Sequence, residues 1–349
     1  MAAYTNIDDP SAHFQATLYT GTGGTRSVTN DGNSDLQPDW IWIKNRNLYQ
    51  HQTYDTNRGA TKKLLISNGN PESTDTNALT AFNTDGFSTG SNVGVNQNSA
   101  GHVAWQWKAN GGTTSTNTSG TRNSVVQANT DAGFSIATAT SPGSNGHWSF
   151  GHGLGVKPDM VITRQIDGGG WWTWHKDLTN QTTYYLDLKS TDGQTNEANM
   201  WGGGMTSSVI GVSSPNSTLV NRNYLAYCFA GKQGYSKFGK YVGNGSDDGP
   251  FVYTGFKPAF LMMKESSSAG GNWVTFDNKR DPHNVAKHRI HPNNTAGDNT
   301  SRNYIDLYSN GFKMRNTDAD HNQNGQTMIY MAIAEQPFVT STGVPATAR

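Results

Sequence analysis

Hydrophobic and aromatic residues gather in short runs that recur three times along the chain. The first run of each set follows a proline, and these runs span residues 38–44, 158–163 and 258–264. A second run closes each set, at residues 103–108, 225–230 and 329–334. From the proline to the second residue of the closing run is 66 residues (38 to 104), then 68 (158 to 226), then 72 (258 to 330). This spacing predicts a triplicated unit of about 100 residues, the size of one small β-sandwich domain.

Within the first set, the pattern predicts about eight short strands separated by Gly, Asn and Asp. The expected strands are residues 14–20, 26–29, 40–44, 51–54, 63–66, 79–82, 87–89 and 103–108. No window of useful length has a 3.6-residue apolar period, so we expect little helix. The run Trp40-Ile41-Trp42-Ile43 is apolar on both faces. Such a strand needs the opposite sheet on one side and a loop or a neighbouring unit on the other.

The fold class expected from these patterns is all-β, with three tandem repeats that are each an antiparallel β-sandwich of the jelly-roll or lectin-like type. The expected repeats are residues 1–110, 132–232 and 233–338, followed by a C-terminal tail at 339–349. Residues 111–131 are rich in Gly, Thr, Ser and Asn and are expected to form a flexible linker, which would leave the first repeat more loosely attached.

Composition narrows the class of protein further. Only 33% of the 349 residues are hydrophobic and 15% are charged, but 10 Trp, 14 Tyr and 13 Phe are too many for a disordered chain. A formal net charge of zero argues against nucleic-acid binding. We find no apolar stretch of the roughly 18–20 residues that a membrane helix needs, and no signal peptide at the start. The single cysteine, Cys228, lies in an expected core strand. These features favour synthesis in a reducing cytoplasm, without membrane insertion.

The sequence gives little support for catalysis. The four glutamates, Glu72, Glu197, Glu265 and Glu335, form no obvious pair of the kind that cleaves glycans, and no nucleophile or zinc-protease motif is present. We therefore expect no enzyme activity and no cofactor.

Two segments carry residue types that bind metal ions. Residues 320–325 match the first half of a calcium loop, but the twelfth position is Met331 in an expected core strand, so a hairpin tip is favoured. A zinc site at His283, His288 and His291 is disfavoured because Pro282 and Pro292 leave no fixed face on which the three rings converge. No metal site is expected.

Tryptophans are the candidate binding residues. Residues 172–175 are placed in register with 273–276 and 51–54, and an aromatic residue or His at every copy indicates a core position. Trp148, Trp171 and Trp201 have no aromatic counterpart in this register, and glycines flank two of them. They could be exposed platforms that stack on a sugar ring, or they could cover the seam between repeats. Trp174 completes the set of candidate glycan or interface residues.

Several longer motifs resemble a known family. They are Tyr241-Val242-Gly243-Asn244-Gly245-Ser246, Phe251-Val252-Tyr253-Thr254-Gly255-Phe256-Lys257-Pro258, the ending Ile329 to Phe338, and the opening Ala3-Tyr4-Thr5 with Asp39 to Arg46. Over almost the whole chain, they are similar to repeat-containing virion structural proteins of marine tailed bacteriophages, of the pelagiphage and cyanophage type. The resemblance implies lectin-like β-sandwich repeats and a structural role, and it assigns no catalytic or binding residue.

The function expected from pattern and resemblance together is that of a bacteriophage virion protein. A tail-fibre or receptor-binding component would contact the host surface through weak, multivalent glycan contacts, together with other virion proteins and as a homo-oligomer, a trimer foremost. The alternative is a capsid decoration or head/tail cement protein with a purely structural role. A polysaccharide depolymerase is the third and least favoured reading.

Overall fold

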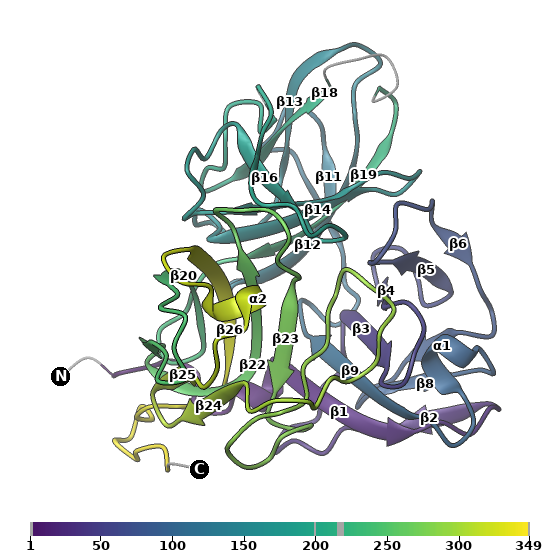
Figure 1. The fold of residues 1–349 in the computed structure, drawn as a ribbon. Helices are drawn as coiled ribbons and strands as arrows, with labels where there is room; N and C mark the ends of the chain where they lie inside the picture. Colours follow the sequence, from purple (N-terminus) through teal and green to yellow (C-terminus); the bar gives the residue numbers. More distant parts are fainter. Residues whose placement is uncertain (1–2, 199, 215–219, 348–349) are drawn as a thin grey trace.

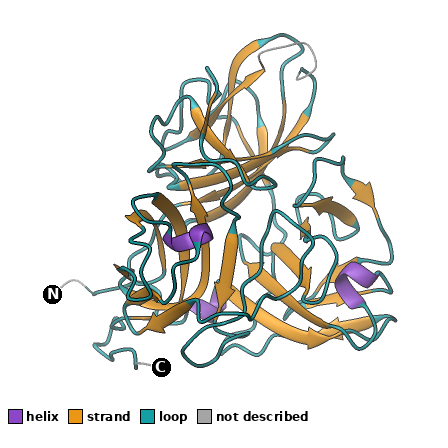
Figure 2. Cartoon of the chain, viewed as in Figure 1, coloured by secondary structure: helices purple, strands orange, loops and turns teal. Residues whose placement is uncertain are grey.

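The computed structural model describes residues 3–198, 200–214 and 220–347, which are almost entirely strand and loop (Figure 2). The helical elements of this part of the chain are one 3-10 turn and two four-residue helices: η1 (Pro10–Ala12), α1 (Val93–Asn96) and α2 (Ala319–Asn322). The all-β prediction is confirmed. Within these ranges, no helix is long and apolar enough to cross a membrane.

Three main sheets carry the fold, and every strand pair in them is antiparallel. The first main sheet has the order β1 (Phe14–Thr20), β9 (Gly101–Trp107), β3 (Trp40–Asn45), β4 (Gln52–Asp55), β5 (Lys62–Leu65), β6 (Ser73–Thr74). A small sheet of β2 (Arg26–Val28), β8 (Phe87–Thr89) and β7 (Leu79–Phe82) packs across its own hydrophobic core against one face. The expected strands of this region match the observed ones to within one or two residues, and the two-residue strand β6 was missed.

The second main sheet has eight strands, two of which are added at one edge. Its order is β10 (Ser115–Asn117), β11 (Ser124–Asn129), β12 (Phe134–Thr140), β19 (Asn223–Phe229), β14 (Met160–Gln165), β15 (Trp171–His175), β16 (Tyr184–Asp187), β17 (Thr195–Asn196). Strands β13 (Gly146–Gly151) and β18 (Val209–Ser214) form the small sheet that packs against it. The expectation of a flexible linker at residues 111–131 is wrong, because β10 and β11 lie within it, β10 pairs with β11, and β11 pairs with β12. The first sheet is also tied to this edge, since Asn57 Nδ2 donates to Val125 O at 3.0 Å.

The third main sheet has four strands. Its order is β20 (Ser236–Val242), β26 (Thr327–Pro337), β22 (Phe256–Glu265), β23 (Val274–Asp277). Its small sheet has the order β21 (Phe251–Tyr253), β25 (Gly311–Met314), β24 (Ile305–Tyr308). The order β1-β9-β3-β4 of the first sheet therefore has the same form as β12-β19-β14-β15 and β20-β26-β22-β23. The two apolar runs of each set are neighbouring strands, as in the pairing of Trp42 with Trp105.

The three main sheets meet around one central core (Figure 1). Alternate side chains of a strand point to opposite faces. Trp40 and Trp42 of β3 accordingly lie in the central core, whereas Ile41 and Ile43 lie in the core shared with the first small sheet. In β14, Met160 and Ile162 face the central core. The prediction that these runs are covered on both faces is confirmed, and the second cover is a neighbouring sheet.

Polar side chains at matching positions cross each seam, the surface where two main sheets meet. The strand pairs Trp40 with Asp55, Met160 with His175 and Phe260 with Asp277 are equivalent. In each case, the residue four positions before the second member of the pair donates a ring N–H to a backbone carbonyl outside its own sheet. Trp171 Nε1 donates to Leu65 O at 2.9 Å, Trp273 Nε1 to Asp187 O at 3.1 Å, and His51 Nε2 to His291 O at 3.1 Å. These three contacts link the second sheet to the first, the third to the second, and the first to the loop that follows β23 of the third.

Three buried cations make a second set of contacts across the same three seams. Lys44 Nζ donates to Thr295 O at 3.0 Å, Lys264 Nζ donates to Thr191 O at 3.2 Å, and an Arg164 guanidinium nitrogen donates to Asn68 O at 3.0 Å. Each occupies the same position near the end of its central strand. Burial lowers the pKa of Lys44 to about 7 and that of Lys264 to about 8, because a charged group loses its hydration in the seam.

Candidate functional site

The four tryptophans proposed as binding platforms are all buried. Their exposed fractions are 2% for Trp148, 1% for Trp171, and 0% for Trp174 and Trp201. Trp174 Nε1 donates to Gln181 O and Trp201 Nε1 donates to Tyr184 O, both at 2.8 Å, so each indole fixes a loop. Trp148 stacks on Phe150, with ring centroids 5.3 Å apart. The expectation of exposed platforms is wrong for these residues. Trp171 instead lies at the seam with the first sheet, the alternative location considered for such residues.

The error has a specific cause in strand register. The sequence comparison placed Trp172 opposite Trp273 and His51, but the pairing of Met160 with His175, Trp40 with Asp55 and Phe260 with Asp277 makes Trp171 the equivalent residue. A slip of one residue moves every side chain to the other face. Trp171 is therefore the matched residue of the central core, and Trp172 is the unmatched one, pointing away from the centre.

Trp172 lines a small aromatic cavity on the outer side of the second main sheet. This aromatic cavity has a volume of about 130 Å³, and its walls come from β14, β15, β16, β18 and the loop that precedes β18. The residues that line it are Thr163, Trp172, Tyr185, Glu197, Ala198, Met200, Trp201, Val212 and Ser213. Pockets that enclose a drug-sized ligand measure roughly 300–1,000 Å³. The aromatic cavity is therefore suited to one ring, with the remainder of a larger ligand in solvent.

The rear wall of the aromatic cavity is held in place by backbone contacts. Glu197 N donates to Thr183 O at 2.9 Å, and the indole of Trp201 anchors the same loop to β16. Gly211 of β18 faces this loop, and a Cβ atom there would lie 2.4 Å from Trp201 O. The glycine is thus required by the close approach of the two backbones.

The exposed side of the cavity combines aromatic rings with hydrogen-bonding groups. Trp172, Tyr185 and Met200 are half-buried, and Glu197 is exposed at the rim. Burial raises the pKa of the Tyr185 phenol, and the nearby Asp187 and Glu197 raise it further. The phenol is therefore a stable donor at neutral pH. Flat rings beside a hydroxyl donor and a carboxylate acceptor can stack on the C–H face of a sugar and bind its hydroxyl groups.

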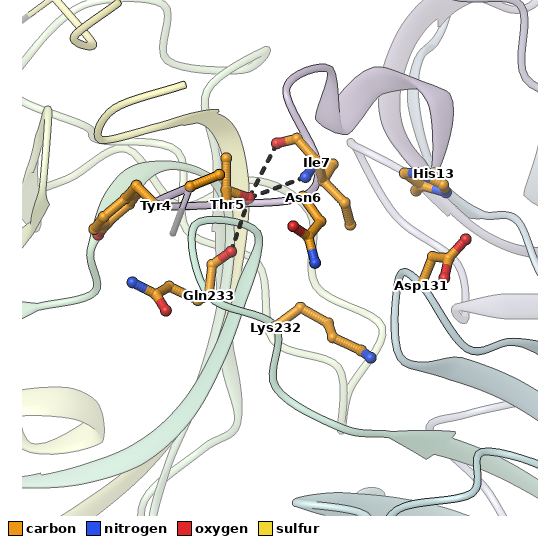
Figure 3. Close-up of a pocket in the computed structure, with 9 residues that line it drawn as sticks. Tyr4, Thr5, Asn6, Ile7, His13, Asp131, Lys232 and Gln233 are labelled. Carbon is orange, nitrogen blue, oxygen red and sulfur yellow. Dashed lines mark hydrogen bonds between the residues drawn. The ribbon is translucent and has the colours of Figure 1, made fainter. Parts of the chain in front are cut away.

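A second cavity, the N-terminal cavity, lies where residues 3–7 cross the loops that join the main sheets (Figure 3). It has a volume of about 390 Å³ and a mostly polar lining that includes His13, Asp131 and Lys232. Thr5 fixes the crossing segment, because its Oγ1 donates to Gln233 O at 2.9 Å and accepts from Ile7 N at 3.0 Å. The sequence comparison gave no indication of this cavity.

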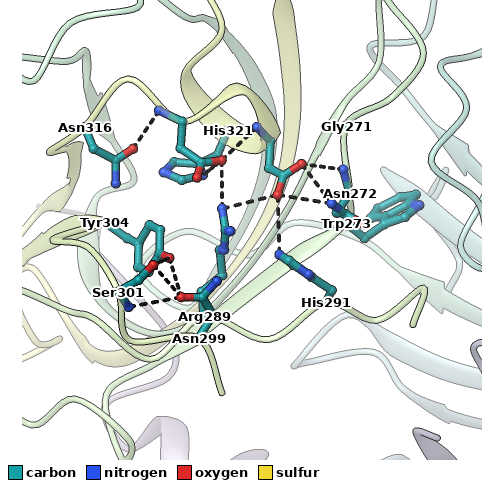
Figure 4. Close-up of polar contacts among 12 residues, drawn as sticks. Gly271, Asn272, Trp273, Arg289, His291, Asn299, Ser301, Tyr304, Asn316 and His321 are labelled. Atoms are coloured by element: carbon teal, nitrogen blue, oxygen red, sulfur yellow. Dashed lines mark hydrogen bonds and ion pairs between the residues drawn. The ribbon is translucent and has the colours of Figure 1, made fainter. Parts of the chain in front are cut away.

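The segment considered as a calcium loop belongs to a buried ionic cluster around α2 (Figure 4). Arg289 contacts Asp318 at 2.7 Å and Asp320 at 3.2 Å, and Asn272 N donates to Asp320 at 2.7 Å. Burial lowers the pKa of His321 to about 4, so its ring is neutral at physiological pH. The cluster ties α2 to the loops around β23 and is structural.

The histidines considered for zinc have different partners. His288 Nδ1 lies 2.8 Å from Asp281, and His291 Nε2 lies 3.4 Å from Asp320 in the cluster of Figure 4. Among residues 3–198, 200–214 and 220–347, no group of three or more His, Cys, Asp or Glu side chains is arranged to hold a metal ion.

Comparison with known proteins places the chain in a family. The family model described as "Domain of unknown function (DUF7483)" matches residues 9–337, and the chain therefore belongs to this family. No curated protein matches the chain.

Proposed function

We propose that this protein is a bacteriophage virion structural protein, a tail-fibre or receptor-binding component that binds host-surface glycans through the aromatic cavity. The observation that carries the proposal is the placement of Trp172 and Tyr185. By strand pairing, their equivalents in the first sheet are Gln52 and Lys63. The shared fold does not need aromatic side chains at these two positions, so a ligand accounts for them better than packing does.

The size of the aromatic cavity implies weak binding at each site. An aromatic stacking contact contributes about 0.5–1.5 kcal/mol beyond buried area, and a dissociation constant near 1 mM corresponds to about −4 kcal/mol. A single sugar ring with a few hydrogen bonds belongs in this range. Useful attachment then needs several copies that engage one surface together. The proposal therefore includes assembly with other virion proteins, and a homo-oligomer, with a trimer favoured.

The proposal also includes the internal repetition of the chain, as three tandem β-sandwich repeats of the lectin-like or jelly-roll type. The recurring strand order supports it, and so do the matched seam contacts. Lys44, Arg164 and Lys264 reach backbone carbonyls from equivalent positions, and His51, Trp171 and Trp273 do the same. Independent sequences would have no reason to place the same type of contact at the same strand position in every sheet.

The test is ligand-observed NMR of the purified protein with a panel of neutral monosaccharides and with glycans released from host envelopes. We expect saturation transfer to at least one sugar, and its loss in Trp172→Ala and Tyr185→Ala. Phe251→Ala is the matched control, because Phe251 is an exposed aromatic residue on β21 of the third sandwich. Absence of any transfer, or equal loss in the control, would contradict glycan binding by the aromatic cavity.

A structural role in capsid decoration or head/tail cementing is the second candidate, and one surface favours it. Val242, Phe251 and Tyr253 are 57%, 47% and 48% exposed on β20 and β21, which are edge strands of their sheets. Apolar side chains on exposed edges suit burial against a neighbouring protein. Location of the protein in a map of the intact virion separates the two candidates. Shortening of a host polysaccharide on incubation would instead indicate the depolymerase.

A further inference from the structure

A third surface cavity, the lysine cavity, adjoins the N-terminal cavity of Figure 3, with which it shares Tyr4, Lys232 and Gln233. It has a volume of about 390 Å³ and lies between the loop that leads into β20 and the end of β21. Its charged lining residues are Lys176, Lys232, Lys237 and Asp159. Lys176 and Lys237 thus bring two ammonium groups to this cavity beside one carboxylate, whereas the Lys232 ammonium group extends to the side of Asp131 in the N-terminal cavity (Figure 3).

The single carboxylate is already engaged. Asp159 contacts Lys176 Nζ at 2.9 Å through one oxygen and accepts from Gly231 N at 2.6 Å through the other. In the part of the chain that the structure describes, no carboxylate lies within ion-pair distance of Lys232 or Lys237. Burial and the charge of Lys176 lower the pKa of Lys237. A bound anion would therefore relieve a repulsion that the protein leaves uncompensated.

The cavity also offers an aromatic surface beside the lysines. Lys237 Nζ donates to Tyr253 O at 2.8 Å and lies 5.2 Å from the centroid of the Tyr253 ring. Tyr253 is about half exposed, and its hydroxyl lies 3.4 Å from that of Tyr4, which donates to Gly255 O at 2.7 Å. The ammonium groups suit an anion, whereas the ring and the paired hydroxyls suit a hydroxylated ring that carries it.

We propose that the lysine cavity binds the acidic group of an anionic saccharide, a carboxylate of a uronic acid or a sulfate ester, with Lys237 and the neighbouring Lys176 as its ligands and Tyr253 against the sugar ring. This site is separate from the aromatic cavity, which has no residue in common with it. It extends the proposed function by naming a charged class of saccharide, and its test does not depend on the result obtained with neutral sugars.

The experiment is calorimetric titration of the full chain at low ionic strength with trigalacturonate, its methyl ester, a sulfated monosaccharide and inorganic sulfate. We expect trigalacturonate to bind and its uncharged ester to bind at least about tenfold more weakly, as the loss of one charge-assisted hydrogen bond predicts. Lys237→Met should weaken the binding of trigalacturonate about tenfold and reduce the salt dependence of this binding. Lys240→Met is the matched control, since Lys240 is exposed on the same strand outside the cavity.

Several outcomes would overturn the proposal. These are no binding of either acidic saccharide, equal binding of the ester, and an equal effect of Lys240→Met. Inorganic sulfate that binds as tightly as the saccharides would show a site for a simple anion and would reject the saccharide. Trp172→Ala should leave trigalacturonate binding unchanged, so failure of the aromatic cavity and failure of the lysine cavity give different results.

Discussion

At the scale of single residues, the seams are built on charged groups that the fold keeps away from water. Lys44, Arg164 and Lys264 lie in these seams and donate to backbone carbonyls. Carbonyl groups that approach from another sheet would otherwise be buried without a donor, at a cost of about 1–3 kcal/mol each. The cations therefore satisfy the backbone of the neighbouring sheet, and the seams depend on them in spite of the desolvation that they incur.

Burial of Lys44 makes stability depend on pH. Its pKa is lowered to about 7 in the folded chain, from a usual value of 10.5. Between these values the unfolded state binds more protons, so the free energy of unfolding rises as pH increases from 7 towards 10. We expect chemical denaturation to show this rise and Lys44→Met to make it smaller, with the remainder from Lys264. Lys240→Met is the surface control. Equal pH slopes for Lys44→Met and the wild type would contradict the assignment.

The pair Trp171 and Trp172 shows what the sequence could and could not reveal about the site. The hydrophobic pattern placed this strand correctly, but alternation alone does not say which of two adjacent tryptophans faces the centre. The register is set by pairing with β14, where His175 lies opposite Met160. An alignment that counted the same number of residues back from the paired end of each strand would have identified Trp172 as the unmatched residue. Tyr185 and Met200 left no signal, because their proximity arises from tertiary contacts.

At the scale of elements, the sequence predicts strands whose side chains are buried. It does not predict polar strands that form only through backbone pairing at a sheet edge. The expected runs at 40–44 and 103–108 correspond to β3 and β9 because their apolar residues report burial on both faces. Strand β10 is Ser-Thr-Asn, and its composition is that of a loop. It forms because β11 offers an unpaired edge, with Thr116 paired to Val125. Edge pairing of polar residues has no hydrophobic periodicity, which explains the incorrect linker.

The loop that closes the aromatic cavity depends on one glycine. A Cβ atom at residue 211 would lie 2.4 Å from Trp201 O, so Gly211→Ala must displace the loop or β18. We expect a loss of about 1–3 kcal/mol in stability from this overpacking, together with loss of sugar binding. Gly24→Ala is the control, because no atom lies within 4 Å of its added Cβ. Denaturation and sugar-binding measurements on both variants test this, and unchanged binding in Gly211→Ala would show that the loop does not shape the cavity.

At the scale of the whole molecule, the three main sheets are held together by one shared core. Side chains from all three main sheets share the central core, as in the contacts of Trp107 with Phe260 and of Trp40 with Tyr227. Two further buried hydrogen bonds cross the centre, from Tyr227 to Asp55 at 2.8 Å and from Trp105 to Asp277 at 3.0 Å. Removal of any one main sheet would expose a large aromatic surface of the other two. The three main sheets therefore stabilise one another.

A shared core predicts that the chain unfolds as one cooperative unit. Asp277 and Arg280 form a fully buried ion pair at 2.6 Å, and Asp277→Ala leaves the guanidinium without this partner. Breaking such a pair costs about 3–5 kcal/mol, which for a chain of this length lowers the melting temperature by about 4–7 °C. Because the core is common to the three sheets, we expect hydrogen exchange to rise together in β3, β14 and β22. The exposed pair of Lys279 and Asp31 joins the loop after β23 to the loop after β2, and Asp31→Ala should cost less than about 1 kcal/mol. Faster exchange confined to the third sheet, or separate calorimetric transitions, would instead show that the main sheets unfold independently.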